Sequence, residues 1–205
     1  MHKTMVFIDY QNFNINLLKH YRESETSFKN VSYNDLSREI NAQIPLESEV
    51  IKTYLFAYKP CDELMQLESY SKYYSWLEKM RNTHYLEIIE GRQVIRKING
   101  VEFDINDTKT YTTEEKETDI NLATHMISKG FQNAYDIAIL VSGDTDYVSV
   151  IKTLHDLGKI IVLAHFSHQN VSKYQGLIDD EVELTDNILN KAAVKHTKIN
   201  SKRDK

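Results

Sequence analysis

Four aspartates in this chain of 205 residues lie where carboxylates could work together. Asp9 follows a short apolar run, Asp144 and Asp146 follow another at residues 137–141, and Asp119 lies between them. In a parallel α/β sheet, residues just beyond the carboxyl ends of the strands converge on one crevice. Carboxylates gathered there repel one another unless a cation is present. The pattern therefore predicts an acidic site for Mg²⁺ or Mn²⁺, which prefer oxygen ligands.

Two such ions would suit the hydrolysis of a phosphodiester. Held about 3.5–4 Å apart, they clamp the attacking and leaving oxygens and make a bound water nucleophilic near neutral pH. Each acid also has a structural alternative: Asp9, Asp144 or Asp146 could cap a following helix, and Asp119 could be a favourable acid in a first helical turn. Singly, capping explains each position equally well, but acids in three separated segments together favour the metal site.

Other catalytic patterns are missing from the sequence. It has no Ser-His-Asp or Cys-His constellation, no phosphate loop of the GxGxxG or Walker A type, and no CxxC or HExxH zinc spacing. A phosphatase of the haloacid dehalogenase type would need acids where Gln11 and Val148 stand, which disfavours that class. The single cysteine, Cys61, excludes an intramolecular disulfide and fits a reducing compartment.

The charge is unevenly distributed along the chain. The net charge is −5, but residues 191–205 hold five Lys, one Arg and one Asp, whereas the rest has 19 basic and 29 acidic residues. A body this acidic needs a local basic surface, the tail or bridging metals to hold a nucleic acid. No apolar stretch could span a bilayer and no signal peptide is apparent, which predicts a cytoplasmic protein with no membrane partner.

The hydrophobic pattern predicts an α/β protein. The expected strands are at 5–8, 50–58, 85–89, 137–141 and 160–164, with an edge strand at 182–184. The expected helices are at 12–21, 33–40, 62–81, 117–129 and 146–157, with a short one in 170–178. From residue 137 onward the alternation predicts a parallel sheet with a right-handed crossover. Asn99-Gly100 favours a tight turn, so residues 93–98 and 101–105 are expected to form a hairpin, followed by a polar segment at 106–115.

The helix expected at 62–81 carries an apolar and aromatic stripe. Its members are Leu64, Leu67, Tyr70, Tyr74, Leu77 and Met80. A stripe of this kind most often packs against a core, which is the favoured interpretation. It could also form the face of a homodimer or stack on nucleic-acid bases.

Three strings, in this order, resemble the NYN domain family, a PIN-like nuclease group that includes LabA-like bacterial proteins. The first, Phe7-Ile8-Asp9-Tyr10-Gln11-Asn12-Phe13, is similar to the family's opening strand with Asp, two variable residues and Asn. The second, Lys116-Glu117-Thr118-Asp119-Ile120, is similar to its Lys-x-x-Asp helix start. The third, Leu140-Val141-Ser142-Gly143-Asp144-Thr145-Asp146-Tyr147, is similar to its Ser-Gly-Asp-Ser-Asp-Phe turn. The resemblance covers roughly residues 4–186.

This resemblance implies a PIN-like, Rossmann-like three-layer α/β/α sandwich with a mainly parallel central sheet, and metal-dependent cleavage of RNA. The metal-binding and catalytic acids would be Asp9, Asp119, Asp144 and Asp146. Asn12 would orient Asp9 or a water on the metal. The expected supporting residues are Ser142 and Thr145, which would hydrogen-bond the turn, and Lys116, which would meet a phosphate.

One position departs from the family pattern. The family often has a further Asp one and a half turns after the Lys-x-x-Asp acid, and His125 stands there. His125 could be a softer metal ligand or a proton shuttle, although a packed or surface histidine is the commoner role. The expected NYN domain spans residues 1–188, with a hairpin or loop insertion around 91–115 that shapes the substrate channel, and a basic, flexible tail at 189–205.

The sequence therefore predicts a metal-dependent ribonuclease that hydrolyses RNA phosphodiesters with a metal-activated water and Mg²⁺ or Mn²⁺ as cofactor. The alternative, from a different class, is a module that keeps the NYN fold and binds RNA or a protein partner with little or no catalysis.

Overall fold

A seven-stranded sheet forms the centre of the computed structural model, which describes residues 1–194. In sheet order the strands are β4 (Tyr111–Lys116), β3 (Leu86–Lys97), β2 (Ser48–Pro60), β1 (His2–Asp9), β5 (Ile137–Val141), β6 (Ile160–His165) and β7 (Asp180–Glu183). Every neighbouring pair is parallel except β3 and β4, which are antiparallel. The sheet is therefore mainly parallel, as the sequence predicts.

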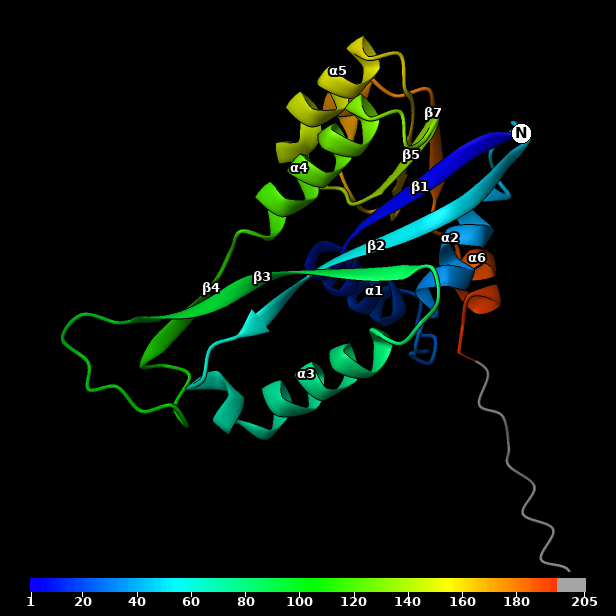
Figure 1. Ribbon diagram of the computed structural model, residues 1–205. Helices are drawn as coiled ribbons and strands as arrows, with labels where there is room; N and C mark the ends of the chain where they lie inside the picture. Colours follow the sequence, from blue (N-terminus) through cyan, green and yellow to red (C-terminus); the bar gives the residue numbers. More distant parts are fainter. Residues whose placement is uncertain (195–205) are drawn as a thin grey trace, which may run out of the picture.

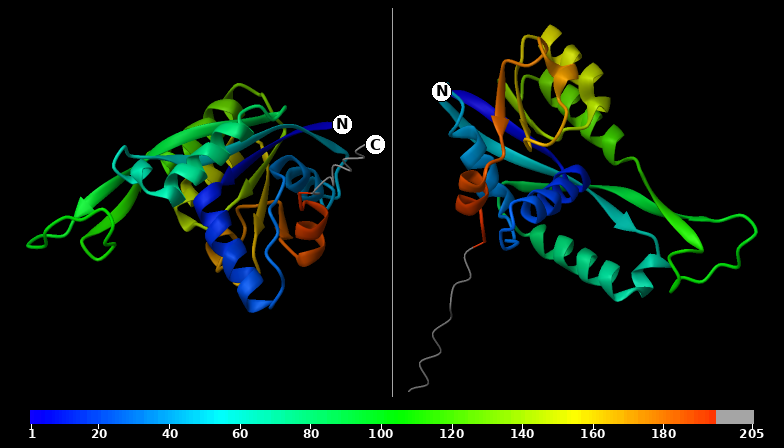
Figure 2. Two further views of the ribbon diagram at one scale, coloured as in Figure 1. Left: turned by 90° about the horizontal axis from the view of Figure 1, so that it is seen from below. Right: turned by 180° about the vertical axis from the view of Figure 1, so that it is seen from behind.

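Helices cover both faces of the sheet (Figure 1). The α-helices are α1 (Tyr10–Glu23), α2 (Tyr33–Asn41), α3 (Glu68–Met80), α4 (Thr118–Phe131), α5 (Val148–Asp156) and α6 (Asp186–Lys191). Short 3-10 turns are η1 (Leu64–Gln66), η2 (Thr145–Tyr147) and η3 (Ser172–Tyr174). Helices α1, α2, α3 and α6 pack on one face and α4 and α5 on the other, which confirms the three-layer sandwich (Figures 1 and 2).

Alternation along the strands divides the core into two layers. In β1, Val6 and Ile8 face the layer that contains α1, whereas Phe7 faces the layer that contains α4. Successive strand side chains point to opposite faces, so a central strand covered on both sides must be apolar throughout. This arrangement lets the strand remain buried up to Asp9, where the first polar side chain of the site appears.

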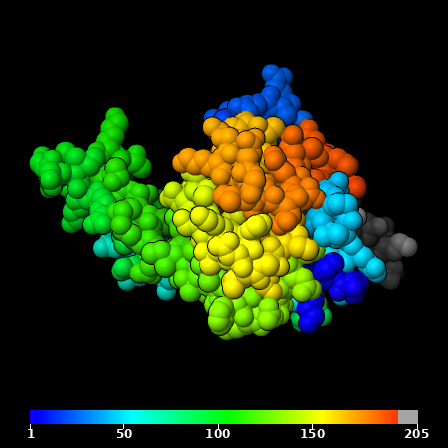
Figure 3. All heavy atoms as spheres, turned by 90° about the horizontal axis from the view of Figure 1, so that it is seen from above, coloured from blue at the N-terminus to red at the C-terminus, as the bar shows by residue number. Residues whose placement is uncertain are grey.

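The expected hairpin around Asn99-Gly100 is wrong. Strand β3 continues to Lys97 and pairs with β4, whose first residue Tyr111 lies opposite Lys97, and the loop between them spans 98–110. Tyr111 is buried and its ring packs edge-on against Phe103, so the partner strand lies further along the chain than the turn signal indicated. The two strands and their loop project from the body as an arm (Figures 1 and 3).

The helix expected at 117–129 ends two residues later than predicted, and Gly130 lies inside it. Helix α4 continues through Gly130 to Phe131. A Cβ at Gly130 would lie 2.7 Å from Leu154 Cδ2 and 2.8 Å from the Tyr135 hydroxyl oxygen. Gly130 therefore permits close packing between α4, α5 and the loop before β5, rather than terminating the helix.

The stripe on residues 62–81 packs largely against the core. Leu64 and Leu77 are fully buried, and Tyr74 and Met80 are partly buried. Within residues 1–194, no helix combines the length and apolar character needed to cross a lipid bilayer.

The packed part of the chain extends beyond residue 188. Leu189 and Ala192 are fully buried, and Ala193 forms a β-bridge with Val31. Most of the basic tail expected at 189–205 lies outside the described residues, because these end at 194.

Candidate active site

Asp9 ends β1 and caps α1. Its Oδ1 accepts a hydrogen bond from the Asn12 backbone N–H (3.1 Å), and its Oδ2 accepts one from the Ser142 hydroxyl (3.1 Å). The residue is only 4% exposed. Burial raises the pKa of Asp9 from 3.8 to about 6; the Asn12 and Ser142 hydrogen bonds oppose this rise, while the charges of Asp119 and Asp144 add to it. Asp9 is therefore both a helix cap and a carboxylate under electrostatic strain.

The turn after β5 presents two further aspartates. The Ser142 hydroxyl that donates to Asp9 also accepts from the Asp144 backbone N–H (3.1 Å). Asp144 Oδ1 in turn accepts from the Asp146 backbone N–H (3.0 Å) and caps η2. The Tyr174 hydroxyl donates to the Asp144 carbonyl oxygen. These bonds fix the turn beside Asp9, with Asp144 half-buried and Asp146 exposed.

Tyr147 connects two of the predicted acids. Its hydroxyl lies 2.8 Å from Asp119 Oδ1 and 3.3 Å from Asp9 Oδ2. The ring is 2% exposed, and burial raises the pKa of Tyr147 well above its usual value, with a further rise from both carboxylates. The hydroxyl therefore stays protonated and supplies one hydrogen atom between two carboxylates.

Asp119 reaches the site from the start of α4. The residue before α4, Glu117, has a left-handed backbone (φ 74°) that turns the chain from β4 into α4. Asp119 lies in the first turn, where the helix dipole favours a negative charge, and is exposed. The structure thus brings Asp9, Asp119 and Asp144 together at the carboxyl ends of β1 and β5, and Asp146 lies in the same turn as Asp144.

The side chain of Asn12 contacts the turn that carries Asp144. Its side-chain oxygen accepts from the Gly143 backbone N–H (3.1 Å) and from Gln169 Nε2 (2.9 Å). The Asn12 side chain therefore fastens α1 to the aspartate turn, and only its backbone N–H contacts Asp9. A Cβ at Gly143 would lie 2.3 Å from Gln169 Nε2, so the Gln169 amide packs directly against the glycine.

The remaining expected residues lie at the margin of the site or away from it. Lys116 forms an ion pair with Glu114, and Thr145 accepts from Lys173 Nζ (3.3 Å). The His125 ring packs edge-on against Phe56, with centroids 5.5 Å apart, and its Nδ1 lies 2.8 Å from the Asn121 carbonyl oxygen. These contacts fit the role of a packed histidine.

Sequence reasoning missed three contributors to the site. Tyr147 was noted only as the end of a motif, and Gln169 lies in a loop without any pattern. Glu115 lies in the segment expected to be a polar loop, but it belongs to β4 and is largely buried. Burial raises the pKa of Glu115 to about 7; the neighbouring Thr118 hydroxyl lowers it, and the charges of Asp9 and Asp119 raise it further. Only the spacing of Glu115, four residues before Asp119, could have indicated it.

The donor set of this site suits a hard divalent cation. Within residues 1–194, none of the four aspartates forms an ion pair with Lys, Arg or His, although the charges of Asp119 and Asp144 help to raise the pKa of Asp9. Carboxylate and hydroxyl oxygens are the ligands that Mg²⁺ and Mn²⁺ prefer. In the same part of the chain, however, no three His, Cys, Asp or Glu side chains converge tightly enough to form a metal site. The residue types fit the cation, whereas the side chains stand in a more open arrangement.

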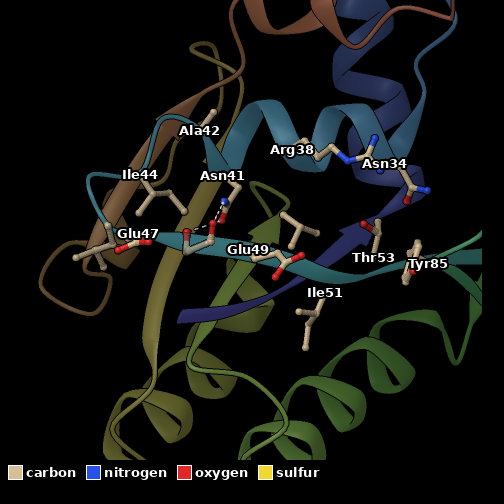
Figure 4. A pocket seen from close by; sticks show the side chains of 13 residues that line it. Asn34, Arg38, Asn41, Ala42, Ile44, Glu47, Glu49, Ile51, Thr53 and Tyr85 are labelled. Atoms are coloured by element: carbon tan, nitrogen blue, oxygen red, sulfur yellow. Dashed lines mark hydrogen bonds between the residues drawn. The ribbon is translucent and has the colours of Figure 1, made fainter. Parts of the chain in front are cut away.

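A pocket elsewhere in the molecule lacks this chemistry. It measures about 750 Å³ and lies between α2 and the start of β2, at the opposite end of the sheet from Asp9 (Figure 4). Asn41 Nδ2 donates to the Ser48 carbonyl oxygen (3.2 Å), and the Ser48 hydroxyl donates to Asn41 Oδ1 (3.0 Å). These polar groups satisfy each other, so the aspartate cluster is the better candidate for an active site.

Comparison with known proteins agrees with this fold. The sequence model of the NYN domain matches residues 3–181. The crystal structure of a protein of unknown function from Vibrio parahaemolyticus is similar in fold, with a TM-score of 0.56 and 16% identity over 94% of this chain and 96% of that chain. No curated protein matches the sequence. Because the match to the NYN domain spans nearly the whole chain, this protein belongs to the NYN domain family and has that family's nuclease-like fold.

Proposed function

We propose that this protein is a metal-dependent ribonuclease. The observation that carries the proposal is the proximity of Asp9, Asp119 and Asp144, from three distant segments, with no cationic side chain from residues 1–194 paired to them. A folded protein tolerates a buried carboxylate such as Asp9 poorly unless a partner compensates its charge. A divalent cation is the partner that this set of oxygens would bind.

Asp9, Asp119, Asp144 and Asp146 would hold Mg²⁺ or Mn²⁺. The cation would supply Lewis acidity and a nucleophile near neutral pH for attack on a phosphodiester. The protein's own residues orient Asp9. The Ser142 and Tyr147 hydroxyls bond its Oδ2, and the Asn12 backbone N–H bonds its Oδ1. Lys173, bonded to Thr145 beside the turn, offers a positive charge for a phosphate of the RNA backbone.

Cleavage of labelled RNA by the pure full-length protein tests this proposal. Single-stranded and structured RNA would be incubated with Mg²⁺, Mn²⁺ or chelator, and Asp144→Asn would be compared with Asp156→Asn. Asp156 ends α5 and is exposed, so its substitution is a matched control for loss of one carboxylate. Metal-dependent cleavage that Asp144→Asn loses and Asp156→Asn keeps is the expected result. Equal cleavage by both variants would contradict the assigned role of Asp144.

One observation favours a second candidate, an RNA-binding module of the same fold with little catalysis. The Tyr147 hydroxyl already lies between Asp9 and Asp119, and within residues 1–194 no three acids reach metal-binding geometry. If the purified protein binds RNA equally well in chelator and Mn²⁺ and shows no turnover in either, this second function replaces the first.

A further inference from the structure

Strand β2 contains an irregularity beside the pocket that lies between α2 and the start of β2. Thr4 of β1 lies opposite Val50 of β2, whereas the next residue, Met5, lies opposite Lys52. Ile51 is therefore an extra residue in β2, which makes the strand bulge at this point. Bulges change the direction in which side chains point, and they are frequent next to functional sites.

The bulge leaves space on the face of the sheet that α2 covers. Val50 packs in the core layer of α2, and the Thr53 hydroxyl donates to Ser37 of that helix (2.9 Å). Ile51 packs in the opposite layer, and Lys52 pairs with a residue of that same opposite layer. No side chain of β2 between Val50 and Thr53 therefore fills the α2 face, and the pocket of about 750 Å³ lies there (Figure 4).

Tyr85 lines this pocket with a strained backbone. Its φ of 63° is in the left-handed region, which bulky residues rarely adopt. Two hydrogen bonds hold the segment: Asn34 Nδ2 donates to the His84 carbonyl oxygen (2.7 Å), and the Thr53 N–H donates to the Tyr85 carbonyl oxygen (2.9 Å). The residue is 70% exposed, so burial of the ring does not offset the strain. Strained residues cluster at ligand sites, and an exposed aromatic ring offers a stacking surface.

Helix α2 contributes polar side chains to the same pocket. Asn34, Arg38 and Asn41 follow one another at spacings of four and three, so they share one face of the helix (Figure 4). Asn34 Oδ1 is buried and has no hydrogen-bond partner within residues 1–194. Arg38 donates from Nη1 to Asp35 (2.9 Å), and its side chain is 64% exposed. The pocket therefore combines an unused acceptor with a guanidinium that has further N–H groups to donate.

We propose that this pocket binds a nucleoside monophosphate whose base carries an amino group. The base stacks on the Tyr85 ring, its amino group donates to Asn34 Oδ1, and Arg38 binds the phosphate. The volume of the cavity is within the range of small-molecule sites. Glu47 and Glu49, which also line the pocket and are exposed, repel the higher charge of a triphosphate.

The pocket lies at the other end of the sheet from the aspartates, so the inference does not depend on RNA cleavage. Isothermal titration with adenosine monophosphate in chelator tests it without any use of activity. The full-length protein should bind one molecule per chain with a Kd below about 1 mM. Purine riboside monophosphate lacks the amino group and should bind about tenfold more weakly. Adenosine triphosphate should also bind more weakly than the monophosphate.

A variant at Tyr85 separates ligand binding from folding. Tyr85→Gly removes the backbone strain, so the Tm should stay the same or rise, whereas affinity for adenosine monophosphate should fall by about tenfold or more. Glu25→Gly is the matched control, because Glu25 is also left-handed (φ 53°) and exposed but does not line the pocket. It should keep the full affinity. Arg38→Gln should weaken binding of the monophosphate and leave binding of adenosine unchanged.

Asp144→Asn shows which end of the sheet holds the nucleotide, and it should bind adenosine monophosphate as the unmodified protein does. Loss of binding in Asp144→Asn, with full affinity in Tyr85→Gly, would assign the nucleotide to the aspartate cluster and overturn the inference. Full affinity in both Tyr85→Gly and Arg38→Gln, or no binding at millimolar nucleotide, would also overturn it. The proposed ribonuclease function would stand in each of these cases.

Discussion

Two groups of polar side chains border the same crevice, but they are satisfied in different ways. Around Asp9, the Ser142 and Tyr147 hydroxyls and the Asn12 backbone supply donors to a buried carboxylate. Around Glu115, Gln93 Oε1 is buried without a partner among residues 1–194, and the Thr118 hydroxyl lowers the pKa of Glu115 that burial raises to about 7. The first group is held by donors that the protein supplies, whereas the second contains a buried oxygen with no donor. The second group is therefore less completely satisfied than the first.

The largest expected effect is on the rate of RNA cleavage, when Asp9 in the first group is replaced. Asp9→Asn keeps the acceptor for the Asn12 N–H but removes the charge, and cleavage should fall by on the order of 100- to 1000-fold if a cation at this residue stabilises the transition state. Initial rates of RNA cleavage in saturating Mn²⁺, with Asp156→Asn alongside, measure the effect. Rates within threefold of the unmodified protein, on the order of 1 kcal/mol or less, would show that Asp9 serves only as a helix cap.

The pH dependence of stability tests whether Asp9 is strained without a cation. Its pKa is raised from 3.8 to about 6, so between these values the folded state binds a proton that the unfolded state has released. Stability from this group is therefore full below about pH 4 and is lost as pH rises through about 6, a change of about 3 kcal/mol.

Urea unfolding in chelator from pH 4 to 8 measures this loss, with Asp9→Asn as reference. The unmodified protein should lose stability relative to the variant as pH rises, and Mn²⁺ should restore it above pH 6. A constant difference between the two proteins across this range would contradict the raised pKa.

A smaller effect is expected from the hydroxyl that links Asp9 to Asp119. Tyr147→Phe should lower stability by about 1–2 kcal/mol, because two acceptors lose their shared donor. It should also change Mn²⁺ affinity, since the spacing of the two carboxylates is no longer fixed.

Tyr135→Phe is the control for this change. Tyr135 is a buried tyrosine whose hydroxyl donates to the Met126 carbonyl oxygen (2.7 Å), away from the acids. It should cost similar stability and leave Mn²⁺ affinity unchanged. Identical Mn²⁺ titrations for the two variants would show that Tyr147 has only a structural role.

The smallest effect is expected at His125. His125→Leu retains a side chain that can pack against Phe56, and Mn²⁺ affinity should change by less than about twofold, compared with about 10- to 100-fold when a group supporting a metal ligand is lost. Isothermal titration with Mn²⁺ measures this. A larger loss of affinity would return His125 to the group of metal ligands.

The residues around Asp9 could be predicted from the sequence because their signals are local. Ser142, Asp144 and Asp146 lie within one turn directly after an apolar strand, and Asp9 follows another. Buried parallel strands are recognisable as continuous apolar runs, so the central strands could be predicted as well. The three layers were implied by the resemblance to the NYN domain family.

The second group could not be predicted in the same way. Gln93 and Glu115 become neighbours only through the register of β3 with β4, and the Asn99-Gly100 signal indicated a nearer partner strand. Tyr147 acts through a hydroxyl whose partners come from β1 and α4, and no local pattern reports such contacts. Long-range pairing, rather than residue type, carried the missing information.

The central position of β1 has a consequence for newly made chains. β1 pairs with β2 on one side and β5 on the other, and β5 begins only at Ile137. During synthesis, Asp9 emerges from the ribosome well before the turn that carries Ser142 and Asp144, because chains are made from the amino terminus. Asp9 therefore lacks its Ser142 hydrogen bond, and β1 lacks one of its two neighbouring strands, until most of the chain has been translated.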